Sequence, residues 1–234
     1  MIKSKNFLWF ATAFFFIVEL VLGVHLHLAS GTDSQWICYT VVLAACIFCA
    51  MFAELSLSYL FTQLALVFTV CADTFLILLP SELYLYGMIF FTCAQLSYAA
   101  RIHFEIESIV LRRVHLIARG AVTAIAVALT FLVLRGGADA LSVISVVYFA
   151  HLITNAVYAC FSFIRNPVFA IGLLLFIGCD IFVGFSNLGG YLPIAEGTIW
   201  YFLAHPGINA AWIFYTPSQA LLSISLFPKR LREI

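Results

Sequence analysis

Long apolar segments, each about the length of a membrane span, recur along the whole chain and constrain its fold more than any other feature. The run Leu57–Leu79 contains a single charged residue, Asp73, and similar runs precede and follow it. In hydrocarbon no water satisfies backbone N–H and C=O groups, so a segment that crosses a membrane must be a helix or a strand of a closed barrel. Runs of about 20 apolar residues fit helices. We therefore expect an all-α, polytopic membrane helix bundle that forms one integral membrane domain over residues 1–234.

The composition supports this expectation and excludes other classes. Hydrophobic residues make up 65% of the chain and charged residues 9%, whereas a soluble domain carries about 25% charged residues. The net charge is zero, and no basic stripe with interleaved aromatic residues is present, so nucleic acid is not an expected partner. The seven cysteines lie almost wholly within apolar runs, and none has a zinc-ligand spacing with histidine. We expect neither a metal nor an organic cofactor.

The apolar runs predict about eight membrane spans and one interfacial helix. Mixed charged and apolar residues between Arg101 and Arg119 favour a helix that lies at the membrane surface. Near the end of the chain, Pro206-Gly207 is expected to separate a short lead-in segment from the last span. The expected spans are residues 7–28, 36–52, 57–79, 83–100, 117–134, 140–163, 168–188 and 207–227.

The basic residues predict the orientation of the bundle. With eight spans, both termini lie on one side, and ten of the eleven Lys and Arg residues fall on that side. Loops rich in Lys and Arg stay in the cytoplasm. We therefore expect a multi-pass protein of the plasma or inner membrane with cytoplasmic N and C termini. The ten residues are Lys3, Lys5, Arg101, Arg112, Arg113, Arg119, Arg165, Lys229, Arg230 and Arg232, and Arg135 alone lies opposite.

Two aspartates inside apolar runs are the strongest candidates for a functional site. A carboxylate in hydrocarbon costs about 2.5–3.5 kcal/mol on insertion scales, so Asp73 and Asp180 are expected to face the bundle interior. Asp73 precedes Pro80 by seven residues and Asp180 precedes Gly189 by nine, which places them about 10 Å and 13 Å from the same end of the bundle. The alternative is that Asp73 is protonated and only hydrogen-bonds a neighbouring helix. The short similarity of CADTFLIL and GCDIFVGF is compatible with a four-plus-four internal repeat.

Further polar residues on apolar helices are candidates for substrate binding. Singly, such residues are more typical of hydrogen bonds between helices. Together with two acids they indicate a polar pocket walled by hydrocarbon, in which a neutral and an ionised carboxyl side by side can act as general acid and base. No GxSxG, P-loop or HExxH motif is present. The candidate binding residues are Glu19, Gln95, Tyr98, Tyr148, Asn155, Tyr215 and Gln219.

Four segments place these residues in a recognisable order: ADTFLILLP with YGMIFFTCAQLSYAARI, then VVYFAHLI, then LLLFIGCDIFVGFSNL, and finally FYTPSQALLSIS. With them, the region from about Leu57 to Leu226 resembles the lysoplasmalogenase family, the YhhN-like eight-span membrane proteins. The family pattern Gly-Asp, Ala-His-x-x-Tyr, Ser-Asp and Tyr-x-x-x-Gln becomes Ala72-Asp73, Ala94-Gln95-x-x-Tyr98, Cys179-Asp180 and Tyr215-x-x-x-Gln219. Gln95 thus replaces the family's His, and the Lys-Pro usual near the second span is missing.

The resemblance implies an acid–base pair at Asp73 and Asp180 that cleaves the vinyl ether of a lysoplasmalogen to a fatty aldehyde and a glycerophospho-alcohol. The implied partners are a lysophospholipid substrate and membrane lipids, and the reaction needs no cofactor. Two other classes remain open. One is a proton-coupled transporter that uses Glu19, Asp73 and Asp180 as titratable groups. The other is a non-catalytic lipid-binding membrane protein of the same fold, which Gln95 favours.

Overall fold

The computed structural model describes residues 5–28, 32–52, 56–206 and 210–227, and these ranges contain helices and no strands. A π-helical segment, Thr74–Leu78, continues the third helix, and a 3-10 turn, Ser81–Leu83, precedes the fourth. The α-helices are α1 Lys5–Leu28, α2 Thr32–Met51, α3 Leu57–Asp73, α4 Tyr84–Glu105, α5 Ile109–Leu134, α6 Ala140–Phe161, α7 Pro167–Leu188, α8 Ile199–Ala204 and α9 Ala210–Ile224.

Seven of the described helices, α1 to α7, are long and apolar enough to cross a membrane. The expected polytopic helix bundle is therefore confirmed, and the protein is an integral membrane protein. The eighth expected span corresponds to α9, whose 15 described residues extend over about 22 Å. The expected lead-in segment is α8, and Gly207 lies outside the described residues.

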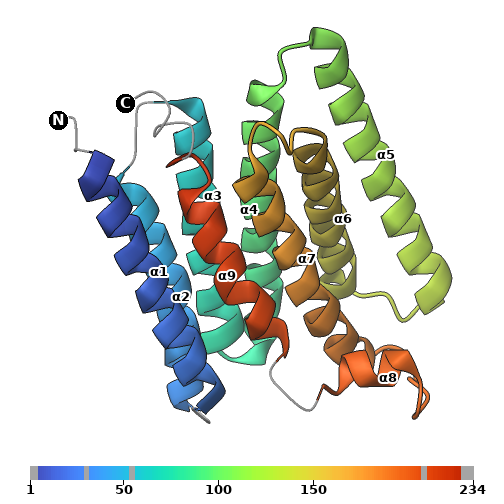
Figure 1. Ribbon diagram of the computed structural model, residues 1–234. Helices are drawn as coiled ribbons and strands as arrows, with labels where there is room; N and C mark the ends of the chain where they lie inside the picture. The colour runs from blue at the N-terminus through green and yellow to red at the C-terminus, as the bar shows by residue number, and fades with distance from the viewer. Residues whose placement is uncertain (1–4, 29–31, 53–55, 207–209, 228–234) are drawn as a thin grey trace.

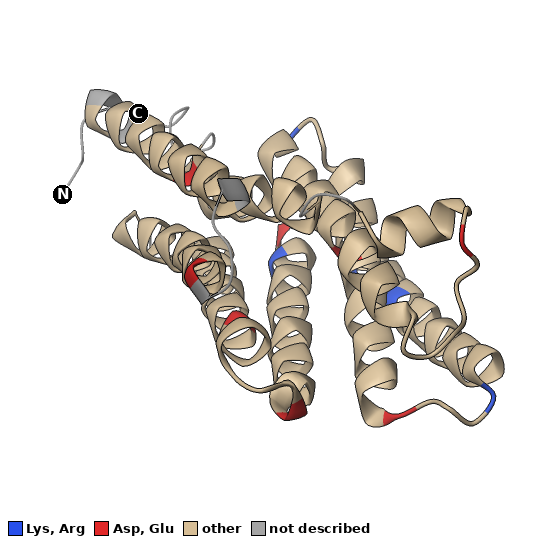
Figure 2. Ribbon diagram, turned by 90° about the horizontal axis from the view of Figure 1, so that it is seen from below, with Lys and Arg blue, Asp and Glu red and all other residues tan. Residues whose placement is uncertain are grey.

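Successive long helices run in opposite directions, so that α1 begins and α9 ends on the same side of the bundle (Figure 1). The most extensive packing joins α3 to α4, α7 to α9 and α4 to α6, while α1 and α5 lie at opposite edges. The helices α3 and α7 run in the same direction, as a four-plus-four repeat requires, although the repeat itself stays a prediction. Viewed from below, most of the ribbon carries no charged residue (Figure 2).

The interfacial helix expected over Arg101–Arg119 is wrong. Residues 101–105 form the last turn of α4, and α5 is one continuous helix from Ile109 to Leu134. Two local interactions explain the break between them. The Ser108 side chain accepts a hydrogen bond from the Leu111 amide and so caps α5, and Arg112 Nε donates to the Ile106 carbonyl at 2.6 Å.

This longer α5 changes the depth of one basic residue. Arg119 lies ten residues into the helix, about 15 Å from its start, and is therefore not a surface residue of the basic side. The residues Arg112, Arg113 and Arg165 do lie near helix ends on that side. Lys3, Lys229, Arg230 and Arg232 lie outside the described residues.

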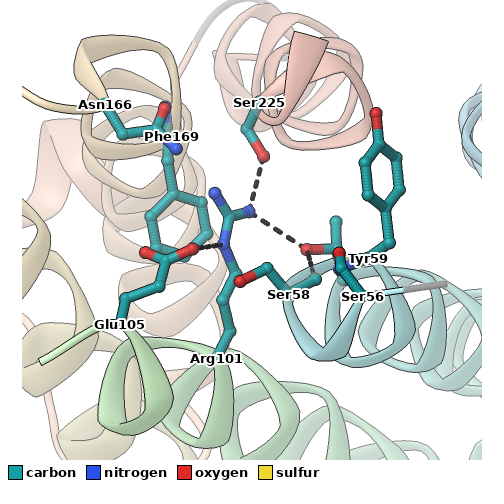
Figure 3. Close-up of polar contacts among 9 residues, drawn as sticks. Ser56, Ser58, Tyr59, Arg101, Glu105, Asn166, Phe169 and Ser225 are labelled. Atoms are coloured by element: carbon teal, nitrogen blue, oxygen red, sulfur yellow. Dashed lines mark hydrogen bonds and ion pairs between the residues drawn. The ribbon is translucent and has the colours of Figure 1, made fainter. Parts of the chain in front are cut away.

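Arg101, expected at a membrane surface, is instead completely buried where the two halves of the chain meet (Figure 3). Its Nη1 donates to Thr62 of α3 at 3.0 Å and to Ser225, directly after α9, at 2.6 Å. Its Nε donates to Glu105 at 3.2 Å, and its guanidinium carbon lies 3.9 Å from the centre of the Phe169 ring of α7. One guanidinium therefore ties α3, α4, α7 and the end of α9 together.

A helix cap fixes the start of α6, at the end of the bundle opposite to Arg101 (Figure 1). Asp139 caps the helix: its Oδ1 accepts from the Ser142 amide at 2.8 Å, and the Tyr191 hydroxyl donates to both carboxylate oxygens. These hydrogen bonds, that from the Ser142 amide above all, hold the pKa of Asp139 below its usual range. The cap's contribution to stability is therefore present at neutral pH and is lost as the pH falls through the lowered pKa.

We predict that Asp139→Ala lowers the free energy of unfolding by about 1 kcal/mol, measured by thermal or denaturant unfolding in detergent. Asp139→Asn keeps a capping oxygen and should retain most of the stability, but without the pH dependence. An equal loss in both variants would show that the charge, rather than the cap, carries the effect.

Candidate functional site

Asp73 lies where α3 changes from an α-helix into the π-helical segment Thr74–Leu78. Its side chain is 3% exposed, and its Oδ2 accepts a hydrogen bond from the Tyr215 hydroxyl of α9 at 2.7 Å. The wider π turn changes the direction of the side chains that follow, a distortion frequent at functional sites. The π-helical segment also packs closely against α4, since a Cβ added to Gly87 of α4 would lie 2.6 Å from Leu76 Cγ. The close approach of α4 therefore depends on glycine at position 87.

Asp180 lies on α7 and is held in the same way by a different helix. Its Oδ2 accepts a hydrogen bond of 2.5 Å from the Tyr148 hydroxyl of α6. The neighbouring turn of α7 approaches α9 closely, since a Cβ added to Gly178 would lie 2.7 Å from the Phe214 ring. Each aspartate thus accepts a hydrogen bond from one tyrosine hydroxyl, and the two tyrosines lie on different helices, α6 and α9.

The two aspartate–tyrosine pairs belong to one cluster inside the bundle, which we call the aspartate cluster: Asp73, Tyr148, Cys179, Asp180 and Tyr215. Asp180 is half-buried, and the other four residues are buried. Asp73 and Asp180 lie close enough for their charges to interact, and Cys179 directly precedes Asp180 on α7. The ring of Phe176 packs edge-on against Tyr215 at 5.5 Å and Tyr148 at 6.4 Å between ring centres. Four helices, α3, α6, α7 and α9, therefore deliver an acid pair, two hydroxyl donors and an apolar wall to one place.

Gln95 and Asn155 lie in a different cluster. Asn155 Nδ2 donates to the carbonyl and to Oε1 of Gln95 at 2.8 and 3.0 Å, and Asn155 Oδ1 accepts from Arg119 Nη2 at 2.7 Å. Arg119 also contacts His115 Nε2 at 2.8 Å and His151 Nδ1 at 2.9 Å. We call these five residues the Arg119 cluster. On α6, Asn155 follows Tyr148 by seven residues, so this cluster lies about 10 Å from the tyrosine along the helix.

The remaining predicted binding residues are buried but reach neither cluster through a hydrogen bond among the described residues. The Tyr98 ring packs edge-on against Phe169 at 5.6 Å, one turn from Arg101, and its hydroxyl has no partner there. The side chain of Gln219 is fully buried, and Glu19 is 2% exposed. No hydrogen-bond partner for the side-chain oxygens of these two residues occurs in the described ranges. Their role in substrate binding stays a prediction.

The aspartates and tyrosines were predicted from the sequence, whereas His115, His151 and the inward position of Arg119 were not. Arg119 was assigned to a surface because the helix was expected to begin only two residues before it. The signal that could have revealed it is spacing: His115 and Arg119 are four residues apart, hence on one helix face. Within the described residues, no group of three or more His, Cys, Asp or Glu residues is arranged to hold a metal ion.

Comparison with known proteins identifies the class. Residues 32–223 match the YhhN family, which is the family of the lysoplasmalogenases. Because the match covers most of the chain, the protein belongs to the YhhN family, and the resemblance drawn from the four motifs is confirmed. No curated protein and no solved structure matches the chain.

Proposed function

We propose that this protein is a membrane-embedded hydrolase that cleaves the vinyl ether bond of a lysoplasmalogen. The products are a fatty aldehyde and a glycerophospho-alcohol. One observation carries the proposal: the only two aspartates expected inside apolar spans lie in one cluster inside the bundle, and each accepts a hydrogen bond from a tyrosine hydroxyl. Membership of the YhhN family supports the substrate class.

The two carboxyls suit the two proton transfers of the reaction. Each carboxyl accepts one tyrosine hydroxyl and keeps a second oxygen for the substrate or water. We assign Asp73 as the general acid and Asp180 as the general base; the exchange of these two roles would leave the chemistry unchanged. Asp73 donates its proton to the β-carbon of the vinyl ether, and the double-bond electrons form the new C–H bond. The resulting oxocarbenium ion carries its charge beside two carboxyl groups, which stabilise it.

Water completes the reaction. Asp180 takes one proton from a water molecule as its oxygen bonds to the cationic carbon, which gives a hemiacetal. The hemiacetal hydroxyl then loses its proton to Asp73, which restores the acid. Asp180 returns its proton to the glycerol oxygen as the C–O bond breaks and the aldehyde forms. The reaction consumes one water and needs no oxidant or metal.

The surroundings suit a lipid chain and the positioning of its reacting end. Apolar rings next to the aspartate cluster, including Phe91, which lies 5.4 Å from Tyr148 and 5.9 Å from Phe176 between ring centres, can hold the alkenyl chain. Tyr148 and Tyr215 are the binding residues best placed to orient the ether. Gln95 cannot gain or lose a proton near neutral pH, so its role is limited to hydrogen bonding.

We further propose that the termini face the cytoplasm and that the protein resides in the plasma or inner membrane. The distribution of Lys and Arg supports this orientation. The start of α1 and the end of α9 lie on one side (Figure 1), which agrees with termini that share a side of the membrane.

This orientation predicts the labelling of single cysteines introduced into a cysteine-free variant. A cysteine beside Glu196, between α7 and α8, should react with an impermeant maleimide added to intact cells. One beside Arg112, near the start of α5, should react only after the cells are opened. The reverse pattern would contradict the orientation but not the fold.

The acid–base pair predicts the behaviour of amide variants. Asp73→Asn and Asp180→Asn should each lower turnover of a lysoplasmalogen by about 100- to 10,000-fold, because each removes a proton-transfer group. The double variant should be little slower than either single variant, since the two residues act as one unit. Turnover is measured as aldehyde released by purified protein.

Two controls separate chemistry from folding. Asp33→Asn makes the same change at the exposed start of α2 and should leave turnover unchanged. Asp73→Asn and Asp180→Asn should keep the thermal stability of the parent, because an amide preserves the shape of the carboxyl and can still accept the tyrosine hydrogen bond. At Asp180 it also removes a charge from the bundle interior. If both fold and turn over normally, the protein is not a carboxylate-pair hydrolase. Transport of a substrate into proteoliposomes without aldehyde release would instead favour a transporter.

A further inference from the structure

The helix α5 is attached to the rest of the bundle in an unusual way. It lies at one edge and packs mainly against α6 (Figure 1). Its buried residues are all polar, namely His115, Arg119 and Thr130, while its many large apolar residues face outward. A helix at a bundle edge normally buries small or apolar residues against its neighbour. The contact between α5 and α6 is therefore built around a charged group.

Arg119 has no ion-pair partner in the described part of the chain. Arg119 is 6% exposed, and within the described residues no carboxylate lies within ion-pair distance of it. Its contacts are the neutral Asn155 and two histidine rings. A guanidinium only donates, so the ring nitrogens that face it must be acceptors, and both histidines are neutral in this arrangement. An unpaired cation at this depth is expensive, and such residues usually mark a ligand or ion site.

The donors of Arg119 are only partly used. The guanidinium has five N–H groups, and three of them serve His151, His115 and Asn155. Nε has no partner among the described residues, and Nη1 keeps a second N–H. The guanidinium thus keeps its charge and two N–H groups for which the described residues supply no acceptor.

A shallow groove of about 700 Å³, largely open to the outside, lies beside this arginine. A Cβ added to Gly120 would meet nothing within 4 Å, so the groove is open beside the arginine. Away from Arg119 the lining is largely apolar and runs along α5 to Ala128, nine residues on, which is about 14 Å. The lining residues are Leu116, Arg119, Gly120, Thr123, Ala124, Val127, Ala128 and His151.

We infer that the groove between α5 and α6 binds a single-chain amphiphile of the fatty-acid type, with its carboxylate at Arg119 and its chain along Gly120–Ala128. The charge is complementary: one carboxylate neutralises one guanidinium, and it accepts the unused N–H groups. The shape is complementary as well, because the groove is polar at one end and apolar along the rest. This site is separate from the aspartate cluster and does not depend on the proposed hydrolysis.

The depth of Arg119 favours a carboxylate over a phosphodiester head group. Arg119 lies six residues beyond Arg113 on α5, about 9 Å deeper in the bundle. A carboxylate brings one charge and three heavy atoms to that depth. A phospholipid head group would also have to remove its phosphate and its alcohol substituent from water, at a larger desolvation cost.

Photolabelling of the purified full-length protein in neutral phosphatidylcholine nanodiscs tests the site. The probes are a diazirine-bearing stearic acid and the corresponding alcohol, which has the same chain but no charge. The acid should label peptides from residues 116–128, and excess oleate should prevent labelling. Neither oleyl alcohol nor acetate should compete, because one lacks the charge and the other lacks the chain.

Three variants decide between the groove and its alternatives. Arg119→Gln should lower labelling by the acid about 10- to 100-fold, the range expected for loss of hydrogen bonds to a charged group. Gly120→Leu should lower it similarly by filling the groove while leaving the charge in place. Gly184→Leu is the matched control, since a Cβ added at Gly184 of α7 also meets nothing within 4 Å, and it should label normally.

The Gly120→Leu result decides the question if Arg119→Gln does not fold. Equal labelling by the acid and the alcohol, or normal labelling of Gly120→Leu, would overturn the proposal. So would a change in the number of protein copies per nanodisc caused by Gly120→Leu with labelling unchanged, since a second copy of the chain would then occupy the groove.

Discussion

Burial of polar groups inside a hydrocarbon-facing bundle is the constraint on which this structure depends. Lipid cannot satisfy them, so each must find its partner on another helix. Residues of α4 make such contacts at three depths in the bundle. Arg101 ties α3, α7 and α9 together near one side, Gln95 joins Asn155 and Arg119 in the middle, and Phe91 packs on Tyr148 beside the aspartate cluster. The apolar faces fix which residues point inward, and these polar contacts fix which helices are neighbours.

The aspartate cluster shows how the same constraint can serve chemistry. A buried carboxyl needs a donor, and here Tyr215 and Tyr148 supply one to each acid from helices that carry no other charge nearby. The acids are thereby held in fixed positions, and one oxygen of each has no hydrogen-bond partner among the described residues. Acid–base catalysis on a lipid ether requires such an arrangement. The π-helical turn after Asp73 and the glycine at position 87 serve the placement of one of these acids.

Much of this was predictable from the sequence because the membrane reduces the choice of structures. The spans, the shared depth of the two aspartates and the family followed from apolar run length and the order of a few motifs. The pairing of polar residues between helices did not follow, because it depends on how each helix is rotated about its own axis. A helix with apolar residues on all faces gives little indication of that rotation in its sequence. Gln95 therefore belongs to the Arg119 cluster rather than to the aspartates. Arg101 and Arg119 were assigned to a surface because one span was expected to end at residue 100 and the next to begin at residue 117. Both side chains are instead buried among partners that are distant in sequence.

The most direct test of the central claim is the isotope content of the product. Purified protein is incubated with a lysoplasmalogen in D₂O, and the aldehyde is trapped at once by reduction and analysed by mass spectrometry. Protonation of carbon by an aspartate that exchanges with solvent predicts one deuterium on the carbon next to the carbonyl in each aldehyde formed. Aldehyde without that deuterium would contradict the mechanism, and the absence of aldehyde would contradict the proposed activity.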